Sequence, residues 1–259
     1  MSASASTPEQ VEAPVEPGLY LYGLVMPDAR VPDGLTGVSG GAVRTVSLGP
    51  VTALVSDVAD MELIGLPDEV RAHGAVLDAV ALSGCSVLPV QFGTTAPDVD
   101  ALASGLPVPR LEAYSDRLRE LAGVVQLSLT ARYDEDAVIA ELVDEEPEIR
   151  RLRDLTRGQP EAATYGERVR LGELVVAGFE RKRAADADFL ARRLAPLAVE
   201  VRHREVGQVD TVLDAALLVR RDAVRRLEDG LEDVAAGIFP RIALRLVGPQ
   251  APYDFAEEV

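Results

Sequence analysis

Apolar and polar residues alternate strictly in "VVQLSLTARYD", which begins at Val124. Val125, Leu127 and Leu129 fall on one side of an extended chain and polar residues fall on the other, so this stretch is predicted to be a half-buried β-strand. Short apolar runs bounded by Gly, Pro or Asp predict the other strands. These span residues 19–25, 43–48, 51–57, 86–90, 197–201, 212–219 and 242–246.

Apolar residues spaced three and four apart predict helices between these strands. Helices are expected at residues 67–83, 98–106, 110–123, 134–157, 165–194 and 222–235. The first begins at Pro67 and two acidic residues, which favour a first turn, and ends at Gly84. Its predicted apolar stripe comprises Val70, Leu77, Val80 and Ala81.

The order of these elements predicts an α+β protein of two domains. From residue 123 the order is strand, helix, strand, strand, helix, strand, which is the ferredoxin-like split βαβ arrangement with a charged helical insertion after its first strand. The expected division is an N-terminal α+β domain over 19–122 and a C-terminal ferredoxin-like domain over 123–247. Residues 1–18, rich in Ser, Ala, Pro and Glu, are expected to be a disordered tail, and 248–259 a C-terminal tail.

The formal net charge of −17 narrows the classes of partner. Nucleic-acid binders need a basic face to displace counterions from phosphate, and anionic membranes attract basic segments, so both partners are disfavoured. No apolar run approaches the roughly 18 residues of a membrane span. The N-terminal residues lack the basic and apolar regions of a signal peptide, so a cytosolic protein is expected.

Residues with catalytic or metal-binding chemistry are few. His73 lies on the apolar stripe of its helix, where a hydrogen-bonded core histidine is the favoured interpretation. His203 and Cys85 have no accompanying nucleophile or ligand motif. "GVSGG", residues 37–41, precedes a strand rather than a helix, so it is predicted to be a flexible loop and not a phosphate site. We therefore expect no enzyme activity, no cofactor and no metal.

The stretch "VLPVQFGTT", residues 87–95, is predicted to be structural. Pro89 cannot donate to a strand ladder, so it indicates a sheet edge or a bulge. Phe92 is expected to anchor a turn in the core, Gly93 to permit the turn backbone, and the threonines to satisfy local donors.

Three motifs, in this order and at these spacings, resemble the gas vesicle protein GvpF/GvpL family. "LYLYGLV" resembles the family's opening strand, and "VLPVQFGTT" with His73 upstream is similar to its H…VLP-x-[RK]FGT signature. "GPQAPYDF", residues 248–255, is similar to its closing segment. Gln91 departs from the basic residue more frequent in the family, so an ionic contact there is not carried over.

The resemblance implies a minor, non-enzymatic component of gas vesicles that is cytoplasmic before assembly. It implies binding to the small hydrophobic shell protein GvpA, and to other gas vesicle proteins, and protection of GvpA from aggregation while the shell nucleates. Strong negative charge would keep such a complex dissolved. The alternative is a ferredoxin-like regulatory or enzymatic domain that binds a small ligand.

Tyr253 and Phe255 are the candidate partner-binding residues. They are alternate residues, so in an extended tail their rings would point the same way. Each buried ring would stabilise a contact by roughly 2 kcal/mol. Equally open is a role in which both rings pack back across the domain junction and tie the domains together.

Overall fold

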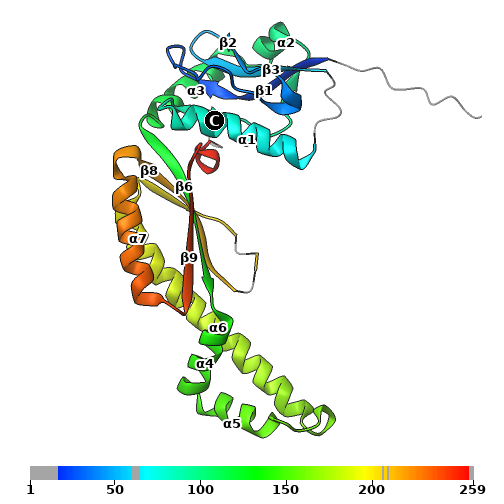
Figure 1. The fold of residues 1–259 in the computed structure, drawn as a ribbon, viewed down its shortest axis with the longest axis vertical. Coiled ribbons are helices and arrows are strands. Elements are labelled where there is room, and N and C mark those ends of the chain that lie inside the picture. The colour runs from blue at the N-terminus through cyan, green and yellow to red at the C-terminus, as the bar shows by residue number, and fades with distance from the viewer. Residues whose placement is uncertain (1–16, 60–64, 206, 209, 257–259) are drawn as a thin grey trace, which may run out of the picture. The chain divides into compact units, whose positions relative to one another are not determined.

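The computed structural model describes residues 17–59, 65–205, 207–208 and 210–256, which divide between Ala122 and Gly123 into two compact units (Figure 1). Most of the N-terminal segment predicted to be disordered lies outside these residues. Its end is a correction, because Gly18 already belongs to the first strand. The α+β class is confirmed, with one antiparallel sheet in each unit.

Unit 1, the residues up to Ala122, contains an antiparallel sheet in the order β2-β3-β1-β4, with β5 also paired to β1. Helices α1 and α3 pack against β1 and β4, and α2 follows β5. Pro89 falls on the edge strand, as its missing N–H requires. The elements are β1 (Gly18–Val25), β2 (Arg44–Ser47), β3 (Thr52–Val58), α1 (Pro67–Leu82), β4 (Val87–Pro89), β5 (Thr95–Ala96), α2 (Val99–Gly105) and α3 (Val108–Glu120).

The buried stripe of α1 begins one turn later than predicted. Val70 is 49% exposed, whereas His73, Leu77 and Val80 are buried. In the first turn the Glu69 carboxylate folds back to accept the backbone N–H groups of Gly65 and Leu66, and the apolar side chains there stay in solvent. The periodicity of α1 was correct, but the point at which it meets the core was not.

The glycine cluster 37–41 is a packed turn and not a flexible loop. Val38 is fully buried, and its backbone N–H donates to the Tyr22 hydroxyl over 2.8 Å. A Cβ built on Gly37 would lie 1.8 Å from that hydroxyl oxygen. Glycine is therefore needed there for close approach of the backbone to a buried tyrosine.

Unit 2, the residues from Gly123, has the strand order β7-β8-β6-β9 with every neighbouring pair antiparallel. Helix α6 connects to β7 and helix α7 connects β8 to β9, so the arrangement is the predicted split βαβ. Helices α4 and α5, the insertion after the first strand, pack on α6. The elements are β6 (Val124–Tyr133), α4 (Glu135–Glu145), α5 (Pro147–Thr156), α6 (Tyr165–Leu194), β7 (Glu200–His203), β8 (Thr211–Arg220), α7 (Val224–Ile238) and β9 (Ile242–Gln250).

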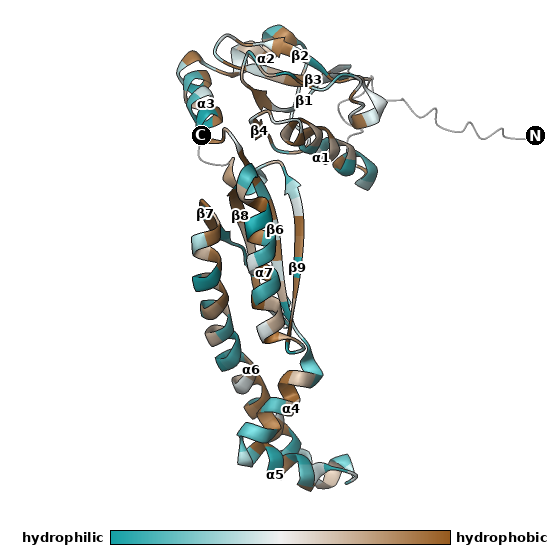
Figure 2. Cartoon of the chain, turned by 60° about the vertical axis from the view of Figure 1, so that its left-hand side comes forward, coloured by the Kyte–Doolittle hydropathy of each residue, from teal (hydrophilic) through white to brown (hydrophobic). Residues whose placement is uncertain are grey.

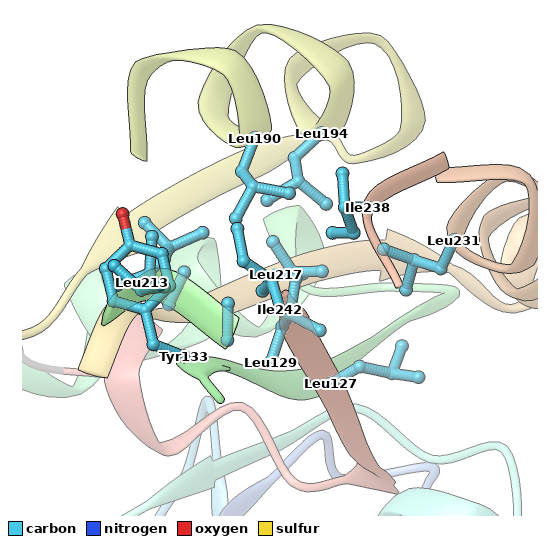
Figure 3. Packing of buried hydrophobic residues seen from close by; sticks show 14 of the residues in the cluster. Leu127, Leu129, Tyr133, Leu190, Leu194, Leu213, Leu217, Leu231, Ile238 and Ile242 are labelled. Atoms are coloured by element: carbon cyan, nitrogen blue, oxygen red, sulfur yellow. The ribbon is translucent and has the colours of Figure 1, made fainter. Parts of the chain in front are cut away.

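The core of unit 2 lies between one face of this sheet and helices α6 and α7 (Figure 3). The alternating residues of β6 supply Leu127 and Leu129, and the two helices supply Leu190 and Leu231. The polar residues of β6 consequently face the other side of the sheet, which these helices leave uncovered. That second face receives the end of the chain.

The predicted tail from residue 248 begins inside a strand. β9 continues to Gln250, which pairs with Gln126 across a register shift. Gly248 has a φ of +127° and lies close to the Gln126 carbonyl, so a Cβ there would come within 2.9 Å of that oxygen. The glycine lets β9 pass this irregular point and stay paired.

Candidate partner-binding site

Tyr253 and Phe255 do not lie in an extended tail. Residues Tyr253–Phe255 form a single 3-10 turn, closed by the Phe255 N–H donating to the Pro252 carbonyl over 3.1 Å. Phe255 is fully buried, and the Arg202 guanidinium lies 5.0 Å from its ring centre. Tyr253 is half-buried. The two rings therefore have different exposures, and the predicted extended geometry was wrong.

Asp254 anchors this turn to the sheet of unit 2. Its carboxylate accepts two hydrogen bonds from Arg204, at 2.8 and 2.6 Å from Nε and Nη2, and another from the Gln126 amide. The Gln126 side-chain oxygen accepts the Asp254 backbone N–H over 3.0 Å. A two-pronged guanidinium–carboxylate pair is among the stronger polar contacts in proteins.

Arg204 also binds Asp214 and the Ser128 hydroxyl, each over 3.0 Å. Hydrogen bonding to Arg204 lowers the pKa of the Asp254 carboxyl, and hydrogen bonding to Asp254 chiefly raises the pKa of Arg204. The Asp254 carboxylate and the Arg204 guanidinium are therefore both charged at neutral pH. It holds the closing turn on the helix-free face of the sheet.

No role was predicted from the sequence for Asp254, Arg202 or Arg204. One signal was present, because Gln126 and Ser128 fall on the polar face of the alternating strand. Arg202, in the short strand β7, and Arg204, just after it, could be assigned to one face from their alternation. Their acidic partner could not, since it lies 50 residues away along the chain from Arg204.

His73 occupies a closed structural network in unit 1. Its Nδ1 lies 2.9 Å from the Tyr20 hydroxyl, and the imidazole donates to the Val90 backbone. Tyr20 also accepts the Gly93 N–H over 3.0 Å, and Phe92 packs edge-on to the imidazole. Burial lowers the pKa of His73 to about 4, so the ring is neutral at neutral pH. The arrangement explains the "VLPVQFGTT" motif as packing.

The other candidates from sequence have structural surroundings. Cys85 contacts the Arg30 carbonyl at 3.4 Å, and His203 is exposed on β7. Arginines of the charged helices pair with nearby acids, as in Arg170 with Glu148. Within the described ranges there is no cluster of three or more His, Cys, Asp or Glu side chains fit to hold a metal. Over the same ranges no helix is both long and apolar enough to cross a membrane.

Helix α6 carries an exposed apolar stripe that the sequence analysis did not assign. Tyr165, Val169 and Val176 are 67%, 46% and 58% exposed. Their spacings of four and seven residues place them on one side of the helix. Leu174 and Val175, by contrast, pack toward the core. Exposed apolar side chains gathered on one side of a helix mark a candidate contact surface.

The chain is thus an α+β protein with two antiparallel sheets. Its candidate contact surfaces are the exposed stripe on α6 and the half-buried Tyr253 of the closing turn. The profile of the family described as "Gas vesicle synthesis protein GvpL/GvpF" matches residues 18–257. The chain belongs to this family. It is an accessory protein of gas vesicles.

Proteins of similar sequence are named gas vesicle protein F or gas vesicle protein L. Gas vesicle protein F of Streptomyces sp. (strain CB03234) is 31% identical, with 92% of this chain and 99% of that protein covered. Gas vesicle protein L of the same strain is 28% identical over 92% of each chain. The crystal structure of GvpF from Anabaena sp. PCC7120 matches with a TM-score of 0.79 at 22% identity, covering 93% of this chain and 99% of that chain. The structural likeness confirms the fold.

Proposed function

We propose that this chain binds the hydrophobic shell protein GvpA and limits its aggregation while a gas vesicle nucleates, without catalysis. The observation that carries the proposal is the α6 stripe of Tyr165, Val169 and Val176, which offers apolar surface to an apolar partner. The net charge of −17 supports it, because an acidic carrier keeps such a complex dissolved. Family membership supports the vesicle context.

Tyr253 and Phe255 have different roles in this proposal: Tyr253 contacts the partner, and Phe255 holds the turn in place. Half-buried Tyr253 presents ring surface next to Arg202 and Arg204, with a hollow of about 350 Å³ beside them. Buried Phe255 supports the turn that carries Tyr253. Partner binding at these two residues stays a prediction, and the Tyr253→Ala variant addresses it directly because it leaves Phe255 and Asp254 in place.

The test is to dilute denatured GvpA into buffer with the full-length chain and to measure the GvpA that stays in the supernatant. We expect wild-type chain to retain it. The variant Tyr165→Ser/Val169→Ser/Val176→Ser should retain several-fold less, since each lost apolar contact is worth about 1 kcal/mol. The matched control is Leu66→Ser/Leu82→Ser/Val108→Ser, three residues of unit 1 that are 65%, 53% and 62% exposed.

Two outcomes contradict different parts of the proposal. If the wild-type chain leaves GvpA in the pellet, GvpA binding itself is wrong. If both triple variants retain GvpA as well as wild type does, the protein binds GvpA through another surface and the α6 assignment is wrong. A small-ligand function is favoured by no observation on the described residues.

A further inference from the structure

Strand β9 is an open edge of the unit 2 sheet. The strand order places it last, and among the described residues β6 is its strand partner. An unpaired edge exposes a row of backbone N–H and C=O groups, which is a template for another extended chain. β9 is nine residues long and largely apolar (Figure 2). Such an edge calls for an account of what pairs with it.

The register identifies the free backbone groups. The Asp134 N–H donates to the Arg241 carbonyl over 2.9 Å, and antiparallel pairs alternate in whether they exchange hydrogen bonds. Residues 243, 245 and 247 therefore bond to β6. The N–H and C=O groups of Ile242, Leu244 and Leu246 point the other way, and no partner for them is found in the described part of the chain.

A groove runs beside this edge, between β9 and helix α7. Its volume is about 390 Å³. Leu231, Leu244 and Leu246 give it an apolar floor. Three acids and one arginine line it as well, so the groove carries a net negative charge; these are Arg225, Glu228, Asp229 and Glu232.

We propose that β9 binds a partner by strand addition, and that the occupant is an extended segment whose α7-facing side chains, every second residue, include both apolar and basic ones. The free N–H and C=O groups require an extended backbone. Every second side chain of the added strand would face α7, where apolar ones meet the leucine floor and basic ones meet Glu228, Asp229 and Glu232. A second copy of this chain is disfavoured, because pairing β9 with β9 would bring two acidic α7 faces together.

This inference deepens the proposed function and rests on it only in taking the partner to be a protein. The probe is a fluorescein-labelled ten-residue peptide with blocked ends and the sequence TVTKTVTKTV, in which Val and Lys share one face, titrated with the full-length chain. We expect saturable binding that weakens with salt and is lost when Glu replaces Lys. N-methylation of every Thr, or of every Val and Lys, removes the donors of one edge or the other. One of these two peptides should lose binding at least about tenfold.

The protein variants separate backbone from side chain. Leu244→Pro removes an N–H that faces away from β6, so the ladder to β6 is kept. Leu244→Ala is the matched control, since it removes the side chain and keeps the N–H. We expect Leu244→Pro to bind the peptide about tenfold more weakly than Leu244→Ala does.

Two charge-reversal variants of α7 test the proposal even if Leu244→Pro does not fold. Glu232 lines the groove, whereas Asp233, its neighbour on α7, lies outside the groove. Glu232→Lys should weaken binding about fivefold and Asp233→Lys less than about twofold.

Three results would overturn the inference. The first is equal binding of the parent and both N-methylated peptides, and the second is equal binding by the two Leu244 variants. The third is a dimer of the wild-type chain in sedimentation velocity that Leu244→Pro abolishes, which would make the occupant a second copy. The assay contains no GvpA, so its failure is distinct from failure of the proposed function.

Discussion

His73 shows how a single residue can make the stability of unit 1 depend on pH. The residue is 5% exposed, and burial lowers its pKa from 6.5 to about 4. Between these two values the unfolded chain binds a proton that the folded chain does not. The free energy of unfolding therefore falls as the pH falls through this window, and it is regained above 6.5.

We expect His73 to lower the free energy of unfolding by about 3 kcal/mol when the pH falls from above 6.5 to below 4. Urea unfolding of wild type and His73→Gln at several pH values measures it, because carboxylates titrate in both proteins and cancel in the difference. The wild-type slope with pH should be the steeper one. Parallel slopes in the two proteins would show that His73 is solvated or already charged in the native state.

At the scale of elements, the docking of the helical insertion depends on Gly178. A Cβ on this residue of α6 would lie 2.7 Å from a methyl carbon of Leu142, which is itself fully buried on α4. Glycine destabilises a helix by about 1 kcal/mol relative to alanine. Its occurrence at this position is explained by the close approach of α4 to α6, which leaves no room for a Cβ. Gly172, on the same helix, has open space around its Cα.

The two glycines provide a matched pair of variants. Gly172→Ala should raise the free energy of unfolding by about 0.5 to 1 kcal/mol through helix propensity. Gly178→Ala gains the same propensity but overpacks Leu142, at a cost of about 1 to 3 kcal/mol, so the net change should be destabilising. Thermal unfolding followed by circular dichroism compares them. Equal stabilisation by both would mean that α4 moves freely on α6.

For the whole molecule, each of the two units has a sheet of its own. The large buried cluster of Leu127, Leu190 and Leu217 draws only on residues of unit 2. Burial of this kind, and not contact with a neighbouring unit, is what stabilises a domain of ordinary size.

We therefore expect residues 123–259, expressed without unit 1, to fold. The measurement is urea unfolding of this fragment, which should be a single cooperative transition with the helix content of unit 2. The full-length chain under the same conditions is the control. A gradual transition, or a spectrum without defined tertiary structure, would contradict the independence of unit 2.

The sequence by itself predicted most of the elements and their order, but not the two-residue strand β5. The alternation in β6 and the three- and four-residue spacing in α7 arise from fixed backbone periods, so both are legible without any partner. Strand and helix order from residue 123 then predicted the split βαβ sheet, because few chain paths join such elements. The glycine of the "FGTT" turn, with a φ of +86°, was predictable for the same local reason.

Only the tertiary structure decided the contacts between distant residues. Asp254 meets Gln126, 128 residues away, and the buried Asp186 accepts hydrogen bonds from Arg241 and Tyr133. The packing around Gly37, the exposure of Val70 and the burial of Phe255 likewise depend on which surface each residue meets. Periodicity assigns a side chain to a face of its own element. What covers that face is fixed by packing across the whole unit, to which many residues far apart in the sequence contribute at once.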